Sequence, residues 1–279
     1  MGNSQPTNRT GRQATAQKLE NAKKVGILSL TEHKLNDIPP AVFDLAAHLK
    51  TLDLSNNSLT RLDPKVAQLT KLKTLILDGN QLCATTLQPI SELSQLQKLI
   101  VSQNDLGHLP RTNKTQPPKT AEPASALPHD LPTTLRELSL AQNRIVDIPP
   151  SVFVLEKLEK MDLSKNQLKG CLIASIGSLK NLTELLLDGN ALTSLPESIG
   201  SLSKLKVLSL KDNALRGKVK PQALPAVLFT KTPVIDLNLH GNPMTNTELN
   251  EFEGFDQFLE RRQKVKSKTM VNLSVCGLS

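Results

Sequence analysis

The stretch that decides the fold is residues 49–59, LKTLDLSNNSL, because the chain repeats it with the same spacing. Residues 72–82 read LKTLILDGNQL, residues 135–145 read LRELSLAQNRI, and residues 182–192 read LTELLLDGNAL. In each copy leucine stands at the first, fourth and sixth positions, asparagine at the ninth, and leucine or isoleucine at the eleventh. Self-similarity at a fixed period indicates structural units that bury their apolar faces against one another.

The pattern LxxLxLxxNxL runs through about nine copies, most of them 23 or 24 residues apart. Leucines at alternate positions of a short strand point to one side, so stacked copies form a parallel sheet with ~4.8 Å between strands. The asparagine side chain can satisfy backbone groups where the chain turns away from the strand. The sequence therefore predicts an α/β solenoid, a leucine-rich-repeat horseshoe with a parallel concave sheet, in which these leucines and asparagines are core residues. The ninth position is occupied by His33, Asn57, Asn80, Asn104, Asn143, Asn166, Asn190, Asn213 and Asn242.

One insertion interrupts the repeats, at about residues 111–131. Asn104 and Asn143 are 39 residues apart, and the excess falls in RTNKTQPPKTAEPASALPHDL, which is rich in Pro, Thr and Ala. This composition favours a flexible surface loop, which a repeat protein tolerates. The alternative is that Pro117-Pro118 belongs to a linker or to a segment that binds a partner.

The two ends of the chain are expected to cover the core. Phe252, Phe255 and Phe258 stand at roughly helical spacing, which predicts a C-terminal capping helix over the last repeat. The stretch Ala16-Leu19-Ala22 is a weaker candidate for the other cap. The predicted parts are a basic N-terminal tail with this cap (1–24), the repeats (25–246), the capping helix (247–263) and a basic C-terminal tail (264–279).

The net charge of +8 is concentrated at the two ends. Residues 1–24 and residues 260–279 each carry five basic residues against one glutamate, and the segment between them is neutral. The chain contains no Trp or Tyr on which bases could stack, so nucleic-acid binding is not expected. An anionic membrane surface explains the same charge, at about 1 kcal/mol per basic residue near the surface.

No motif has the spacing of a catalytic or metal site. The sequence contains neither a phosphate-binding loop nor GxGxxG, and its five histidines and three cysteines are scattered. Carboxylates on an open sheet do not exclude water well enough for acid–base catalysis. We therefore expect no enzyme activity, cofactor or metal. The odd cysteine count and the lack of a leader or of roughly 18 consecutive apolar residues favour a cytoplasmic location.

Both ends contain short patterns for lipid attachment. Met1-Gly2-Asn3-Ser4 permits N-myristoylation of Gly2, although the motif asks for Ser or Thr at position six and this chain has Pro6. Cys276 begins CGLS, which satisfies the C-a-a-X pattern for prenylation. One myristoyl chain binds a membrane only marginally, so the basic residues would supply the second signal. The alternative is a solvated basic tail with an ordinary glycine.

The MGNS start, the short repeats with DLSNN and LxxLP, and the ending FEGFDQFLERRQKVKSK resemble the short intracellular leucine-rich-repeat family. The resemblance covers nearly the whole chain, except the insertion and the last residues, VNLSVCGLS. It implies a protein without catalytic activity that is anchored on the cytosolic face of a membrane through an N-myristoyl glycine, which would be Gly2 here.

The residues that flank the strand leucines are predicted to form a concave binding surface. Carboxylates outnumber basic residues there, and four apolar side chains stand where ordinary repeats are polar. We expect a protein partner with a basic, partly apolar surface, which apolar residues anchor and carboxylates steer. The alternative is a solvated sheet face with incidental carboxylates. The candidate residues are Asp53, Ile76, Asp78, Ile100, Asp162, Leu186, Asp188, Val207 and Asp236.

These features predict a monomeric, non-catalytic scaffold or adaptor for protein–protein interaction, attached peripherally to a cytoplasmic membrane by myristoylation and basic tails. The rival is a soluble cytosolic regulatory subunit of a phosphatase or small-GTPase pathway. The lipid state of Gly2 separates the two functions.

Overall fold

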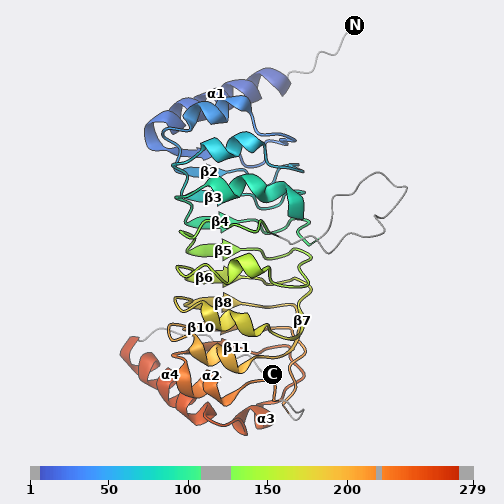
Figure 1. Ribbon diagram of the computed structural model, residues 1–279, viewed down its shortest axis with the longest axis vertical. Coiled ribbons are helices and arrows are strands. Elements are labelled where there is room, and N and C mark those ends of the chain that lie inside the picture. The colour runs from blue at the N-terminus through green and yellow to red at the C-terminus, as the bar shows by residue number, and fades with distance from the viewer. Residues whose placement is uncertain (1–6, 108–126, 218–221, 270–279) are drawn as a thin grey trace, which may run out of the picture.

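The computed structural model describes residues 7–107, 127–217 and 222–269, and the predicted insertion lies mostly outside them. Figure 1 shows a solenoid whose turns stack along its long axis. Within the described residues one parallel sheet of nine strands runs the length of the solenoid. This confirms the predicted leucine-rich-repeat fold, with one strand per repeat. The strands are β1 (Ile27–Ser29), β2 (Thr51–Asp53), β3 (Thr74–Ile76), β4 (Lys98–Ile100), β5 (Glu137–Ser139), β6 (Lys160–Asp162), β8 (Glu184–Leu186), β10 (Val207–Ser209) and β11 (Asp236–Asn238).

Each strand is three residues long and buries its central residue. Leu52 at the centre of β2 is fully buried and pairs in register with Leu75 of β3, and Leu138 of β5 pairs with Met161 of β6. The flanking residues point away from the core. Because burying a leucine contributes about 1.5–3 kcal/mol and each leucine is covered by the next repeat, the stacking of neighbours stabilises the fold.

The pattern asparagines connect neighbouring repeats, as expected for core residues. Asn57 lies after β2, and its Oδ1 accepts hydrogen bonds from the N–H groups of His33 and Leu35, both at 3.0 Å. Its Nδ2 donates to the carbonyl oxygens of Leu30 at 2.9 Å and Leu54 at 2.8 Å. One amide thus pairs backbone groups of two repeats that turn away from their strands and would otherwise be buried without partners.

The convex side is built from short 3-10 helices and turns. Proline begins η1, η2 and η4, because its fixed φ suits the first helical residue. Two further strands, β7 (Lys169–Cys171) and β9 (Ala191–Ser194), pair with each other on the side away from the main sheet. The 3-10 helices are η1 (Pro40–Leu45), η2 (Pro64–Gln68), η3 (Ala84–Glu92), η4 (Pro150–Val152), η5 (Ala174–Ser178) and η6 (Glu197–Ser201).

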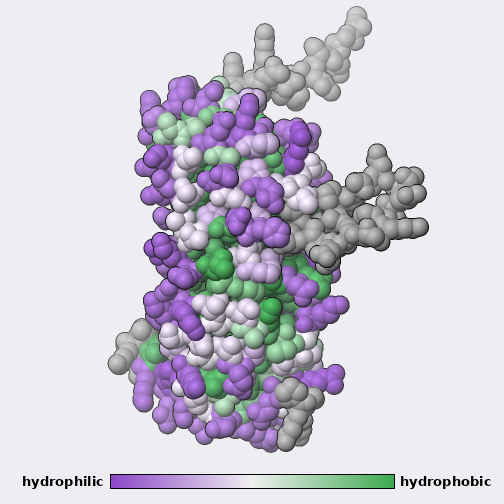
Figure 2. All heavy atoms as spheres, viewed as in Figure 1, coloured by the Kyte–Doolittle hydropathy of each residue, from purple (hydrophilic) through white to green (hydrophobic). Residues whose placement is uncertain are grey.

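Helices cover both ends of the solenoid (Figure 1). At the N-terminal end α1 (Thr7–Val25) buries Ala22 against the first repeat. At the other end lie α2 (Ala226–Lys231), α3 (Asn246–Asn250) and α4 (Phe255–Thr269). The segment expected as one helix over 247–263 therefore forms two, since Gly254 between them has φ +83°. Figure 2 shows hydrophilic residues over much of both ends and hydrophobic residues gathered nearer the middle of this face.

Four phenylalanines form the apolar contact at the C-terminal end. Phe258 is fully buried, and its ring centroid lies 5.5 Å from that of Phe255 and 6.1 Å from that of Phe229 in α2. Phe252 meets Phe229 edge to face at 6.5 Å. Since Phe229 of α2 contacts both Phe255 and Phe258, α4 is held by aromatic packing as well as by area burial.

Candidate functional site

Equivalent side chains of successive repeats form rows across the concave face, because the strands pair in register. The row made by the last residue of each strand carries Ile76 and Ile100 side by side. It continues through Ser139 and Asp162 to Leu186. Apolar side chains thus flank a polar centre in the middle of the sheet.

A hollow of about 300 Å³ lies on this face over β4, β5, β6 and β8. Ile100 and Leu186 stand three strand spacings apart within it, or about 14 Å. Next to Ile100 in the row stands Ser139, whose Oγ is 2.8 Å from the Oγ of Ser102 and shares a hydrogen bond with it. The hollow therefore combines two apolar side chains with hydroxyls that can donate and accept.

Charges of alternating sign form the row at the start of these strands. Lys98 Nζ lies 2.7 Å from Glu137 Oε1. Lys160 Nζ lies 2.9 Å from Glu184 Oε2, and this hydrogen bond and the Glu184 charge raise the pKa of Lys160. Lys98 is not a lining residue of the hollow but pairs with Glu137, which is one. Because these four charges balance, Asp78 and Asp162 supply the remaining negative charge.

Asp78 is a half-buried carboxylate at the edge of the hollow. Burial raises the pKa of Asp78, and the charges of Asp53 and Asp162 act in the same direction. The N–H of Ser102, which donates to Oδ1 at 2.8 Å, and the more distant Lys98 oppose this shift only in part. The ionised carboxylate is therefore incompletely compensated, and a cation bound beside it would stabilise it.

Other predicted carboxylates support the local backbone. Asp53 accepts a hydrogen bond from the N–H of Ser55, and Asp162 accepts one from the N–H of Ser164, both at 2.9 Å. Asp188 accepts one from the N–H of Lys211 at 2.8 Å. These bonds agree with the structural alternative, although each carboxylate keeps further acceptor capacity towards the concave side.

The structure brings four of the nine candidate residues together in the hollow: Asp78, Ile100, Asp162 and Leu186. The other five also belong to the concave rows but lie outside the hollow. Asp53 and Ile76 are in earlier repeats, Asp188 follows β8, and Val207 and Asp236 begin β10 and β11. Gly2 and Cys276 lie outside the described residues.

The balanced row of charges was not among the predicted binding residues. Lys98, Glu137, Lys160 and Glu184 each begin a strand, and their signs alternate. The alternation is visible in the sequence only after strand starts are aligned across the insertion, which separates Lys98 from Glu137 by 39 positions.

The hollow has the chemistry of a recognition surface. Among the described residues, no group of three or more His, Cys, Asp or Glu side chains is placed to hold a metal ion. No helix in the same ranges is long and apolar enough to cross a membrane. An open depression with apolar, hydroxyl and carboxylate groups is suited to contact with another protein.

The described residues have the leucine-rich-repeat fold. The family model described as Leucine rich repeat matches residues 23–82 and 133–192. Proteins of this family and fold are generally non-catalytic modules for protein interaction.

Comparisons with individual proteins agree. The plant intracellular Ras-group-related LRR protein 8 of Oryza sativa subsp. japonica is 32% identical over 271 residues, which cover 90% of this chain and 61% of that protein. A protein phosphatase 1 regulatory inhibitor subunit homologue of Arabidopsis thaliana is 27% identical over 175 residues, or 57% of this chain and 49% of that protein. The structure of a leucine-rich-repeat protein of Leptospira interrogans superposes with a TM-score of 0.58 at 27% identity, covering 87% of this chain and 58% of that one. The chain spans less than two thirds of the length of these curated relatives.

Proposed function

We propose that this protein is a non-catalytic scaffold that binds a basic, partly apolar segment of a protein partner in the concave hollow. The proposal depends on one observation: Ile100 and Leu186 share a depression with the carboxylates of Asp78 and Asp162. Apolar side chains that become fully desolvated carry most of the energy at an interface. Opposite charge speeds association and sets orientation.

The spacing of the hollow describes the segment that would fit. Ile100 and Leu186 are about 14 Å apart, a distance that about four residues of an extended chain span. Asp162 stands beside Leu186 in the same row, between the two apolar residues. We therefore expect two apolar residues about four positions apart in the partner, with Lys or Arg between them.

Leu186→Glu tests the hollow, and Ile173→Glu is the matched control. Ile173 is 45% exposed and lies in a different depression beside β7, so the control adds the same charge away from the concave face. A partner captured by the wild-type protein is purified, and its Kd is measured for all three proteins. We expect Leu186→Glu to raise Kd about 30-fold or more, the effect of losing an interface anchor worth about 2 kcal/mol. Equal Kd values for the three proteins would contradict the proposal.

We also propose that the scaffold is attached to a cytoplasmic membrane through a myristoyl group on Gly2. The support is the MGNS start, the basic N-terminal segment, and the resemblance of the MGNS start and the FEGFDQFLERRQKVKSK segment to the short intracellular leucine-rich-repeat family. Intact-mass measurement of the protein from eukaryotic cells should show the myristoyl increment, and Gly2→Ala should remove it. The same spectrum reports a prenyl group on Cys276, with Cys276→Ser as its control.

A soluble regulatory subunit is the second candidate function. It is favoured by the similarity to the phosphatase 1 regulatory inhibitor subunit homologue of Arabidopsis thaliana. An unmodified chain that binds the catalytic subunit of protein phosphatase 1 in solution, and loses this binding in Leu186→Glu, would establish this function in place of the membrane scaffold.

A further inference from the structure

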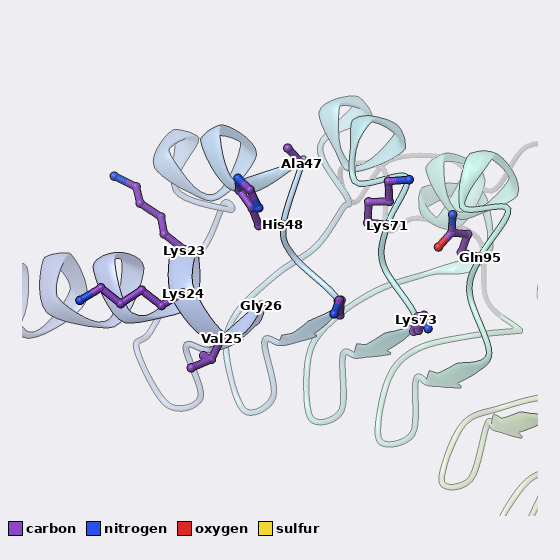
Figure 3. Close-up of a pocket in the computed structure, with 10 residues that line it drawn as sticks. Lys23, Lys24, Val25, Gly26, Ala47, His48, Lys71, Lys73 and Gln95 are labelled. Atoms are coloured by element: carbon purple, nitrogen blue, oxygen red, sulfur yellow. The ribbon is translucent and has the colours of Figure 1, made fainter.

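A cluster of lysines lies at the N-terminal end of the solenoid, apart from the concave hollow. Lys23 and Lys24 come from the end of α1, and Lys50, Lys71 and Lys73 come from the turns before β2 and β3. Figure 3 shows Lys23 and Lys24 on one side of His48 and Lys71 and Lys73 on the other. These lysines surround an open depression of about 400 Å³ whose lining contains no carboxylate. We call these five residues the lysine edge.

The backbone places two of these lysines side by side. The N–H of Lys50 donates to the carbonyl oxygen of Gly26, and the N–H of Lys73 donates to that of Lys50, both at 2.8 Å. Lys50 and Lys73 are therefore consecutive members of one hydrogen-bonded row, with ~4.8 Å between neighbours. Like charges opposite each other on adjacent strands destabilise a sheet.

Few carboxylates offset this repulsion. Lys23 pairs with Glu20 at 2.6 Å, and Asp44 lies close enough to contribute to the raised pKa of Lys23. Within the described part of the chain, no ion pair is formed by the remaining four members of the lysine edge. Their positive charge faces solvent.

The same row is balanced further along the solenoid. After Lys73 the hydrogen-bonded row continues through Gln97, Arg136 and Glu159, and Arg136 forms an ion pair with Glu159. On the concave face lysine and glutamate alternate in the same way. Further along, Lys206 stands in this row between Thr183 and Ile235, so only the first repeats place two lysines next to each other in the described part of the row. Such neighbouring like charges suit an anionic ligand.

We propose that the lysine edge binds the anionic surface of a lipid membrane. Its lining contains lysine and no arginine. Arginine is the side chain whose planar guanidinium binds a single phosphate or carboxylate through two parallel hydrogen bonds. The depression is open, which suits a surface of many headgroups. Val25 and Ile27 beside it are 61% and 56% exposed, and such side chains can enter the boundary between headgroups and acyl chains.

This arrangement would orient the scaffold. The N-terminal edge of the first repeats would contact the membrane, and the concave hollow over β4 to β8 would stay open to a protein partner. The orienting role rests on the proposed scaffold function. The contact between the lysine edge and the membrane requires neither the lipid on Gly2 nor the protein partner.

The test uses the full chain made in bacteria, which add no myristoyl group. Binding is measured by sedimentation with vesicles of phosphatidylcholine, with and without phosphatidylserine. Lys50→Gln/Lys71→Gln/Lys73→Gln removes three charges from the lysine edge. The control, Lys157→Gln/Lys180→Gln/Lys206→Gln, removes three charges from exposed lysines of later repeats on the same side. Circular dichroism verifies that all variants fold.

We expect binding only to vesicles that contain phosphatidylserine. Each lysine near such a surface contributes about fivefold, so the lysine-edge variant should lose about 100-fold in partition coefficient. The control should lose much less. Binding should weaken as salt shortens the Debye length from ~30 Å at 0.01 M to ~8 Å at 0.15 M.

Three results would overturn the inference: no binding to anionic vesicles, an equal loss in the control, or binding to soluble polyglutamate in place of vesicles. The last would assign the lysine edge to an acidic protein. Leu186→Glu should bind vesicles as the wild type does. The proposal of partner binding in the concave hollow and the proposal of membrane binding at the lysine edge can therefore fail independently.

Discussion

Replacing Asn143 by alanine should weaken the junction that follows the insertion. Asn143 is 7% exposed, and its Oδ1 accepts a hydrogen bond from the N–H of Leu106 at 3.1 Å. Its Nδ2 donates to the carbonyl oxygens of Val101 and Leu140, both at 2.9 Å. Two of these partners precede the insertion, so one amide joins the repeats on both sides of it.

The expected loss follows from these three bonds. Each contributes about 1 kcal/mol net, and a buried group left without a partner costs about 1–3 kcal/mol. Since alanine leaves the N–H of Leu106 and the carbonyl of Val101 unpaired, we expect the free energy of unfolding to fall by about 3–4 kcal/mol. Asn181→Ala is the control: this residue also donates to a backbone carbonyl, that of Glu156 at 2.7 Å, but at an exposed site. There water replaces the bond, and we expect a loss below about 1 kcal/mol.

Two measurements check this prediction. Urea unfolding is followed by far-ultraviolet circular dichroism, because the chain has no Trp or Tyr to report by fluorescence. Hydrogen exchange at the Leu106 amide reports the local bond, even if the solenoid unfolds in parts. Equal losses for the two variants, or unchanged exchange at Leu106, would refute the reasoning. Since Ile100 and Ser139 pair across this junction, the result also bears on the hollow.

Asp78→Asn should raise the free energy of unfolding at pH 7, because burial raises the pKa of Asp78 and disfavours its ionised form. The same substitution removes a negative charge and should therefore weaken binding of a basic partner. A raised folded-state pKa means that the wild-type protein loses stability as pH rises from the ordinary aspartate pKa to the raised one. Urea curves of the two proteins should therefore differ most above this window and converge below it, and a variant no more stable at pH 7 would contradict the assignment. Phe258→Ala removes a fully buried ring and should cost about 3–5 kcal/mol in the same assay, whereas partly buried Phe153→Ala should cost clearly less; equal costs would argue against aromatic packing at the C-terminal end.

The repeat period alone was enough to predict the strands and the ladder of asparagines. Each depends on residues a few positions apart, such as Leu52, Leu54 and Asn57, and the same local chemistry recurs in every copy. Strand pairing then follows, because a repeat can bury its leucines only against its neighbours. For the same reason the concave residues could be named in advance, from the positions that flank the buried leucines.

Which of those residues act together was decided only by the tertiary structure. Ile100 and Ser139 become neighbours because β4 pairs with β5 across the insertion, a register that no local pattern contains. The lysine edge is equally non-local: Lys24, Lys50 and Lys73 are ordinary surface lysines in sequence, more than 20 positions apart. Stacking brings Lys50 and Lys73 within one strand spacing of each other, and charge repulsion depends on that distance in space, not on separation along the chain.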